Sequence, residues 1–205
     1  MENIIFLRYI IKYKIKIKVI DLFLHGRRKS RYSLDYHMVD IIKPIERYLN
    51  HYESIVDLVS RSNQELKTAI IKREVVETNR YLGKYLELPI ATKLMHIIRL
   101  RIINNIPAYI ENSWLPMTLF PNFDNIEIDD KSLYKILHEH YNFEINERRE
   151  ELMLVRASDL DKEYLKVNDE SNVLLIKGIT KQRDGRIIEY FENTALPELF
   201  IFKGE

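Results

Sequence analysis

The sequence predicts an α+β fold in which a mostly antiparallel sheet carries helices packed on one of its faces. Several segments rich in Ile and Val have the length and composition of strands, and short amphipathic segments lie between them. Two dipeptides, Asn104-Asn105 and Asp184-Gly185, each separate two such strands and are typical of tight hairpin turns. Because hairpins join antiparallel neighbours, the sheet should be largely antiparallel.

The N-terminal part of the chain contains two predicted elements. Residues 13–19 alternate between polar and apolar side chains, which predicts a strand, although the apolar spacing around them also permits a helix. From His37 to Ser60 apolar residues recur mostly every three or four positions, which predicts an amphipathic helix. Pro44 is expected to begin or kink this helix, and residues 60–63 are expected to end it.

The centre of the chain has the pattern of a hairpin preceded by another strand. Residues 68–76 and 94–102 are predicted strands, and a helical segment near residues 80–86 separates them. The turn at Asn104-Asn105 then leads into a strand over residues 108–115.

The second half begins with a predicted helix and continues mainly with strands. Asp129-Asp130 supplies a carboxylate cap, and apolar residues follow at i, i+3 and i+4 spacing, which marks a helix start. The remaining predicted elements are a long charged strand (144–157), a short capped helix (158–165), a hairpin (173–180 with 187–194) and a closing segment (199–202).

The composition excludes several classes of function. The chain has no Cys, which rules out disulfide frameworks, zinc–thiolate sites and cysteine nucleophiles. Apolar residues make up 46% and charged residues 31%, with only 5 Gly and 6 Pro, which is a globular rather than a disordered composition. No uninterrupted apolar run approaches the ~18–20 residues of a membrane span. We therefore expect a cytoplasmic protein with no membrane partner.

The net charge of +1 conceals a basic N-terminal segment. Residues 1–31 contain nine basic and two acidic side chains, and the rest of the chain is mildly acidic. We therefore divide the chain into a basic segment, residues 1–36, and one domain, residues 37–205. The basic segment either packs on the domain through its apolar face or meets DNA or a membrane surface.

The run from Arg99 to Pro116 resembles the UTRA effector-binding domain of HutC-like regulators in the GntR family of bacterial transcription regulators. In that family an Arg-x-Arg strand, a turn, a Pro and a strand ending in Glu-x-x-Tyr-Leu-Pro recur together. Five pieces in the family's order, spread over about residues 55–203, make the resemblance specific. The four that follow the first are Phe120-Pro121, residues 131–137, residues 163–167 and residues 184–190.

The resemblance implies a chorismate-lyase-like fold, no cofactor, and a homodimeric transcription regulator whose effector domain modulates DNA binding. It also implies a small anionic effector, such as a sugar phosphate or an organic acid. Such regulators begin with a winged helix, of which the basic segment here holds only a faint remnant at residues 16–28. We therefore expect this chain by itself to make only weak, salt-sensitive contacts with DNA phosphates.

Two positions near the C-terminus depart from the family pattern. Where the family often has a Tyr six residues after the Glu of its late hairpin, this sequence has Ala195, and a Gly-Asp pair is replaced by Leu196-Pro197-Glu198. The effector is therefore expected to bind differently here, or not at all.

Arg99 and Arg101 are the first candidate site residues. They share a face of their strand, where two guanidiniums form a fork for a phosphate or carboxylate. From the residues alone, a solvated strand face paired with acidic neighbours is the better interpretation. The resemblance instead favours an anion clamp.

Glu111 joins the two arginines only if the loop at Asn104-Asn105 is bulged or has three residues. A plain two-residue loop pairs Glu111 with Ile98 and turns it to the opposite face. Asn tolerates the left-handed conformation that such bulges need, so we expect Glu111 beside Arg99. It would accept hydrogen bonds from the effector or serve as a structural partner of Arg99.

Four further candidates complete the predicted site. Ser132 and Tyr134 fall in the first turn of the helix after Asp129-Asp130, where free N–H groups and the helix dipole favour an anion. Alternatively, Ser132 only caps the helix and Tyr134 lies in the core. Thr68 and Glu189 are implied by the resemblance, as a small hydroxyl residue before the first strand and as the Glu of the late hairpin.

The remaining His, Trp and Tyr candidates are expected to have structural roles. The imidazoles of His138-Glu139-His140 would lie on different sides of a helix, so no metal site is expected. His96, Trp114 and Tyr190 are expected to pack in the core. Two alternative functions stay open: a chorismate-lyase-like enzyme, against which stands the lack of a nucleophile with a matched base, and an orphan dimerisation module without its own DNA reader.

Overall fold

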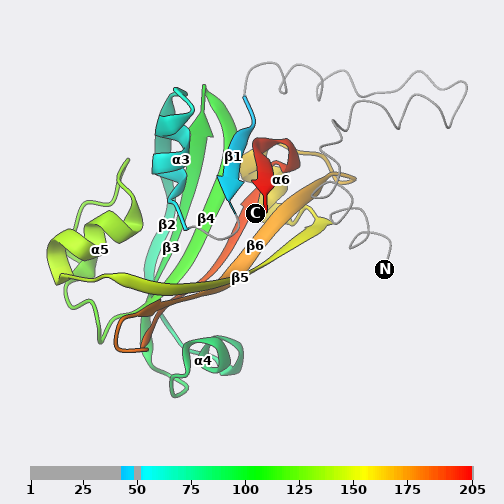
Figure 1. Cartoon of the computed structure of the whole chain (residues 1–205). Coiled ribbons are helices and arrows are strands. Elements are labelled where there is room, and N and C mark those ends of the chain that lie inside the picture. The colour runs from blue at the N-terminus through cyan, green and yellow to red at the C-terminus, as the bar shows by residue number, and fades with distance from the viewer. Residues whose placement is uncertain (1–42, 49–51, 205) are drawn as a thin grey trace, which may run out of the picture.

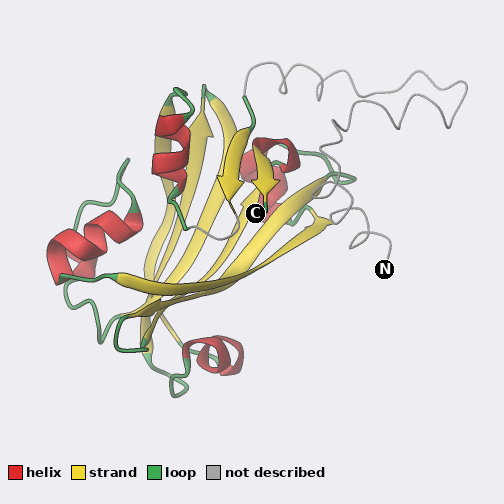
Figure 2. Cartoon of the chain, viewed as in Figure 1, coloured by secondary structure: helices red, strands yellow, loops and turns green. Residues whose placement is uncertain are grey.

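The computed structural model describes residues 43–48 and 52–204, and at its centre lies a six-stranded antiparallel sheet (Figures 1 and 2). The strand order is β2-β3-β4-β7-β6-β5. Pairing of β4 with β7 joins the two predicted hairpins into one sheet, which confirms the α+β class. The basic segment 1–36 and the predicted strand 13–19 lie outside the described residues. The strands are β2 (Leu66–Glu77), β3 (Lys93–Ile103), β4 (Ile106–Pro116), β5 (Ile145–Arg156), β6 (Asn172–Gln182) and β7 (Ile187–Ala195).

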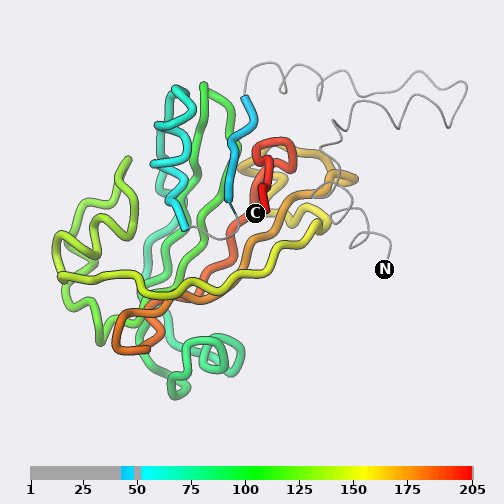
Figure 3. Tube along the Cα trace, in the orientation of Figure 1, coloured from blue at the N-terminus to red at the C-terminus, as the bar shows by residue number. Residues whose placement is uncertain are grey.

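A second, parallel pair of strands brings the two ends of the domain together. β1 (Ile45–Tyr48) pairs with β8 (Phe200–Lys203), and Figure 3 shows the blue β1 beside the red C-terminal segment. The predicted helix over 37–60 is therefore wrong at β1, and the described helix is only α3 (Ile55–Arg61). Along β1 buried and exposed residues alternate, and its hydrogen-bond partners come from the far end of the chain.

Each helix begins at a polar N-cap residue. Ser54 and Asn79 accept backbone N–H bonds at the starts of α3 and α4 (Arg80–Leu86), and Ser158 forms a capping box with Asp161 at α6 (Asp159–Leu165). α5 (Leu133–Tyr141) starts at Ser132 and not at Asp129-Asp130 as predicted. Two short 3-10 turns, η2 (Phe123–Asn125) and η3 (Pro197–Leu199), complete the described elements. None of the described helices is long and apolar enough to cross a membrane.

Helices cover both faces of the sheet, so the expectation that they pack on one face is wrong. Glu189 and Tyr190 of β7 point to opposite faces because side chains alternate along a strand. Tyr134 of α5 bonds to Glu189, whereas Tyr81 of α4 bonds to Tyr190 at 2.7 Å. Thr194, on the same side as Tyr190, bonds to α6 at 2.5 Å. We call the side of Glu189 the pocket face; α5, α3 and β1 lie over it (Figure 1).

The turn between β3 and β4 sets the register that the site depends on. Asn104 and Asn105 have φ values of 49° and 65°, so both occupy the left-handed region of a two-residue type I′ turn. The register then shifts by one residue after Arg101, at a bulge in β4. As a result Arg99 lies directly opposite Glu111, as expected, but the reason differs: the loop is the plain two-residue one, and the bulge lies inside β4.

The face opposite the pocket carries a stack of aromatic rings. His96 lies parallel to Trp114 with ring centroids 4.7 Å apart, and Trp114 stacks on Tyr190 at 5.6 Å. His96 and Tyr190 are buried, as predicted, whereas Trp114 is only partly buried. These residues stabilise the packing of α4 on the sheet.

Candidate functional site

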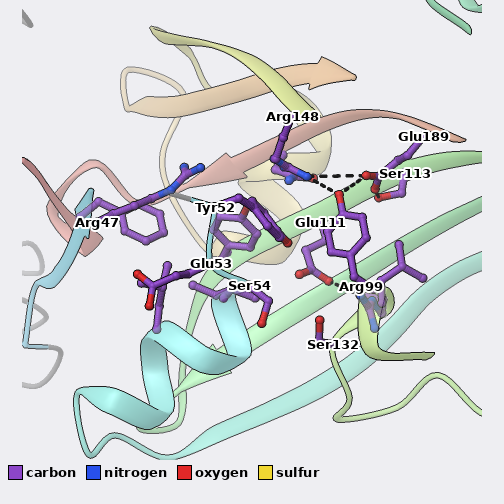
Figure 4. Close-up of a pocket in the computed structure, with 17 residues that line it drawn as sticks. Arg47, Tyr52, Glu53, Ser54, Arg99, Glu111, Ser113, Ser132, Arg148 and Glu189 are labelled. Carbon is purple, nitrogen blue, oxygen red and sulfur yellow. Dashed lines mark hydrogen bonds and ion pairs between the residues drawn. The ribbon is translucent and has the colours of Figure 1, made fainter. Parts of the chain in front are cut away.

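A pocket lies between the pocket face of the sheet and its cover of α3, β1 and the start of α5 (Figure 4). It contains about 490 Å³ of space not filled by atoms, including its open mouth. Charged and hydroxyl-bearing side chains dominate its wall. The residues that line it are Arg47, Tyr52, Glu53, Ser54, Ile55, Leu58, Arg99, Tyr109, Glu111, Ser113, Ser132, Leu133, Tyr134, Arg148, Glu189, Asn193 and Phe200.

Arg99, Arg101 and Glu111 form a buried ion cluster at one end of the pocket. Glu111 Oε2 lies 2.7 Å from Arg99 Nη2 and 2.9 Å from Arg101 Nη2. Burial alone would raise the pKa of Glu111, but Arg101 and Arg99 outweigh burial and hold that pKa below its ordinary value. Glu111 is therefore ionised and leaves one positive charge in the cluster uncompensated.

The same two arginines also hold the loop that precedes α5. Arg99 Nη1 donates to the carbonyls of Ile128 and Lys131, both at 3.0 Å, and Arg101 Nη2 donates to Lys131 at 3.2 Å. These bonds fix residues 128–131 outside the helix. This explains why α5 starts at Ser132, later than the start predicted from Asp129-Asp130.

Ser132 presents an open hydroxyl at the N-terminus of α5. Its side chain makes no capping hydrogen bond, although it occupies the N-cap position. The first backbone bond of the helix runs from Ile136 N–H to Ser132, so the N–H groups of residues 133–135 precede the helical ladder. An open hydroxyl, free N–H groups and the positive end of the helix dipole together favour an anion.

Glu189 lies at the centre of a second buried network. Its Oε1 accepts from Ser113 at 2.7 Å, and its Oε2 accepts from Thr180 at 2.9 Å and from the hydroxyl of Tyr134. Burial raises the pKa of Tyr134 well above its ordinary value, so this hydroxyl stays protonated and donates. Arg148 balances the charge, with its Nη1 3.6 Å from Glu189 Oε2.

Arg148 and Arg47 are pocket residues that sequence reasoning missed. Arg148 comes from β5, where its guanidinium lies 3.6 Å from the ring centre of Phe191 and 4.6 Å from that of Tyr52. Glu150 joins the two arginines, since its Oε1 accepts from Arg47 and its Oε2 from Arg148. Alternation separates Arg148 and Glu150 from their exposed neighbours in β5. The sequence carries no such signal, because residues 147–151 are all charged and nothing in them marks which side chains are covered.

The structure brings most of the predicted site residues together. Five of them line the pocket: Arg99, Glu111, Ser132, Tyr134 and Glu189. The other two, Arg101 and Thr68, lie behind its wall, where Arg101 Nη1 donates to Thr68 Oγ1 at 2.5 Å. Whether these residues bind an effector stays a prediction.

The departure at Ala195 is partly offset by a neighbouring aromatic residue. Ala195 pairs directly with Tyr109 across β7 and β4, and Tyr109 lines the pocket. An aromatic ring is therefore present next to the position where the family often has its tyrosine.

The lowered pKa values of the Glu111 and Glu150 carboxyls should make the stability of the domain depend on pH. For Glu150 too, burial is outweighed by Arg47 and Arg148, which hold its pKa below the ordinary value. Such carboxyls stabilise the folded state above their unfolded pKa of about 4.3 and lose that contribution as the pH falls through the folded pKa. We expect urea titrations to show that Glu150→Gln lowers the free energy of unfolding near pH 7 and that the difference from wild type shrinks below about pH 4. A difference that stays constant with pH would contradict this ionisation.

The architecture is similar to that of solved domains of GntR-family transcription regulators. The effector domain of PhnF from Mycobacterium smegmatis superimposes with a TM-score of 0.73 at 12% identity, covering 78% of this chain and 98% of that domain. A GntR-family regulator from Bacillus cereus superimposes with a TM-score of 0.62 at 24% identity, covering 68% and 96%.

The family follows from the sequence match. The UTRA domain model matches residues 61–200, and the chain therefore belongs to the UTRA domain family. A probable fructoselysine utilization operon transcriptional repressor from Escherichia coli K12 is 22% identical over 122 residues, 60% of this chain and 50% of the repressor. The mannosyl-D-glycerate transport/metabolism system repressor of the same strain is 21% identical over 140 residues, 68% of this chain and 58% of the repressor. The chain thus spans about half the length of these relatives.

Proposed function

We propose that this domain binds a small anionic metabolite derived from a sugar, such as a sugar phosphate or an organic acid, and that binding modulates the DNA affinity of a transcription regulator. The observation that carries the proposal is the convergence of Arg99, the open hydroxyl of Ser132 and the N-terminus of α5 at one end of the pocket. A guanidinium, a hydroxyl and helical N–H groups are all donors that suit an anion.

The remaining candidate residues have distinct roles in this proposal. Glu111 and Tyr134 contact polar groups of the ligand beside the anion, and Glu189 holds Tyr134 in place through their hydrogen bond. Arg101 and Thr68 act from behind the wall, because Arg101 bonds to both Glu111 and Thr68.

The names of the relatives support both parts of the proposal. Fructoselysine and mannosyl-D-glycerate are sugar derivatives, and both relatives are named as repressors, which favours a sensor over a chorismate-lyase-like enzyme. For the whole protein we propose a homodimer that contacts DNA through a winged helix.

Substitution of either arginine tests the site. A thermal-shift screen of sugar phosphates and organic acids first identifies a ligand, since specific binding raises the melting temperature by mass action. In calorimetric titrations, Arg99→Ala should weaken that ligand about ten- to a hundredfold, the cost of one charge-assisted contact. Arg101→Ala should also weaken it, because Arg101 holds Glu111 and the loop before α5 from behind the wall.

The matched control is Arg149→Ala, because the Arg149 side chain is 66% exposed and lies outside the pocket. It should bind as wild type does. If Arg99→Ala and Arg101→Ala also fold and bind as tightly as wild type, the ligand site lies elsewhere.

A further inference from the structure

The end of the pocket beside β1 and β5 has its own pair of guanidiniums, Arg47 and Arg148. The side chains of Arg47 and Arg148 are only 7% and 8% exposed, and the proposed function gives them no part. Figure 4 shows them on one side of the pocket, with Arg99 and Ser132 on the other. In the sheet order, β5 with Arg148 is four strands away from β3 with Arg99. The pocket therefore has a second cationic end besides Arg99, and α5 reaches it too, because Arg148 donates to the hydroxyl of Tyr134.

Both guanidiniums at this end keep donors open. Among the described residues, Nε and Nη1 of Arg47 and Nη2 of Arg148 have no hydrogen-bond partner. These three nitrogens are also in part accessible to solvent. In the described chain, the one side-chain nitrogen or oxygen that is both fully buried and without a hydrogen-bond partner is Nε of Arg73. Their other nitrogens bond to Glu150, Tyr134 and Thr180, which hold the two groups in place.

We propose that Arg47 and Arg148 bind a carboxylate of the effector, so that the ligand carries an anionic group at each end. This inference rests on the proposed function, because it requires one ligand to reach from Arg99 and Ser132 to Arg47 and Arg148. A carboxylate is planar and accepts two parallel bonds from fixed guanidinium donors. Two carboxylates, Glu150 and Glu189, already balance the two arginines. Because these charges are already balanced, the open guanidinium N–H donors, and not an excess of positive charge, favour a carboxylate at this end.

A matched pair of probes tests the carboxylate directly. 6-Phosphogluconate and sorbitol 6-phosphate have the same six-carbon chain and the same phosphate, and they differ only in a terminal carboxylate against a terminal hydroxymethyl group. In calorimetric titrations of the full chain, 6-phosphogluconate should bind at least about tenfold more tightly, as one charge-assisted contact implies.

The preference should disappear in Arg47→Gln. This variant is the safer one, because Glu150 keeps its bond to Arg148 at 3.2 Å when Arg47 is lost. Arg148→Gln should abolish the preference too if it folds, as judged by circular dichroism. Arg149→Gln changes an exposed arginine of the same strand and should leave the preference intact.

The outcomes separate the two proposals. Equal binding of both probes to wild type would overturn the carboxylate subsite and leave the proposed function standing. A preference that survives in Arg47→Gln would also overturn it, since the carboxylate would then be recognised elsewhere. If neither probe binds, the proposed function fails for phosphorylated ligands and this inference fails with it.

Discussion

Glu111→Gln should lower the free energy of unfolding by about 3–5 kcal/mol, the usual cost of breaking a buried ion pair by removing one partner. In the described part of the chain, Glu111 is the one carboxylate in contact with both Arg99 and Arg101, whose side chains are 2% and 0% exposed. Glutamine keeps the shape but leaves two guanidiniums side by side without a counter-charge. Urea unfolding at neutral pH measures the loss.

The control for this experiment is Glu151→Gln. Glu151 faces solvent on β5, with a side chain 72% exposed and a 3.5 Å contact to Lys177, so its loss should change stability by no more than about 0.5 kcal/mol. A small effect of Glu111→Gln, comparable with this control, would mean that the carboxylate does not hold the two arginines. Its role would then be confined to the ligand.

Gly178→Ala should cost about 3 kcal/mol, at the upper end of the range for overpacking. Gly178 of β6 pairs with Glu150 of β5, and a Cβ added there would lie 1.9 Å from the carbonyl oxygen of Arg149. The carbonyl oxygen of Arg149 belongs to the backbone and cannot rotate away as the end of a flexible side chain could, so the two strands must separate. Because β5 carries Arg148 and Glu150, the end of the pocket formed by Arg47 and Arg148 should be lost together with stability.

Gly204→Ala is the matched control, since no atom lies within 4 Å of a Cβ at that position. Its melting temperature should stay close to that of wild type. If Gly178→Ala melts like this control, the strands β5 and β6 do not approach as closely as the structure shows.

The candidate site shows how far local pattern reaches. Alternation placed Arg99 and Arg101 on one face, as the structure shows. Glu111 was expected opposite Arg99 because of a bulged loop, but Asn104 and Asn105 form a plain two-residue turn, and a bulge within β4 sets the register. The pattern did not reveal that both arginines also hold the carbonyls before α5. Those contacts join β3 to a loop about thirty residues later in the chain, and side-chain reach of this kind leaves no periodic signal.

Local sequence pattern predicts the strands of the main sheet, their two hairpin turns and the starts of α4 and α6, because alternation, turn residues and caps act between near neighbours in the chain. Tertiary structure alone decided that residues 45–48 form a strand and not a helix, since β8 lies at the other end of the domain. It also decided that helices cover both faces and that Arg47 and Arg148 meet across Glu150. Such contacts depend on which distant segments lie side by side in the folded chain. Burying a charged side chain is unfavourable unless a partner from another segment balances its charge, and local pattern does not reveal that partner.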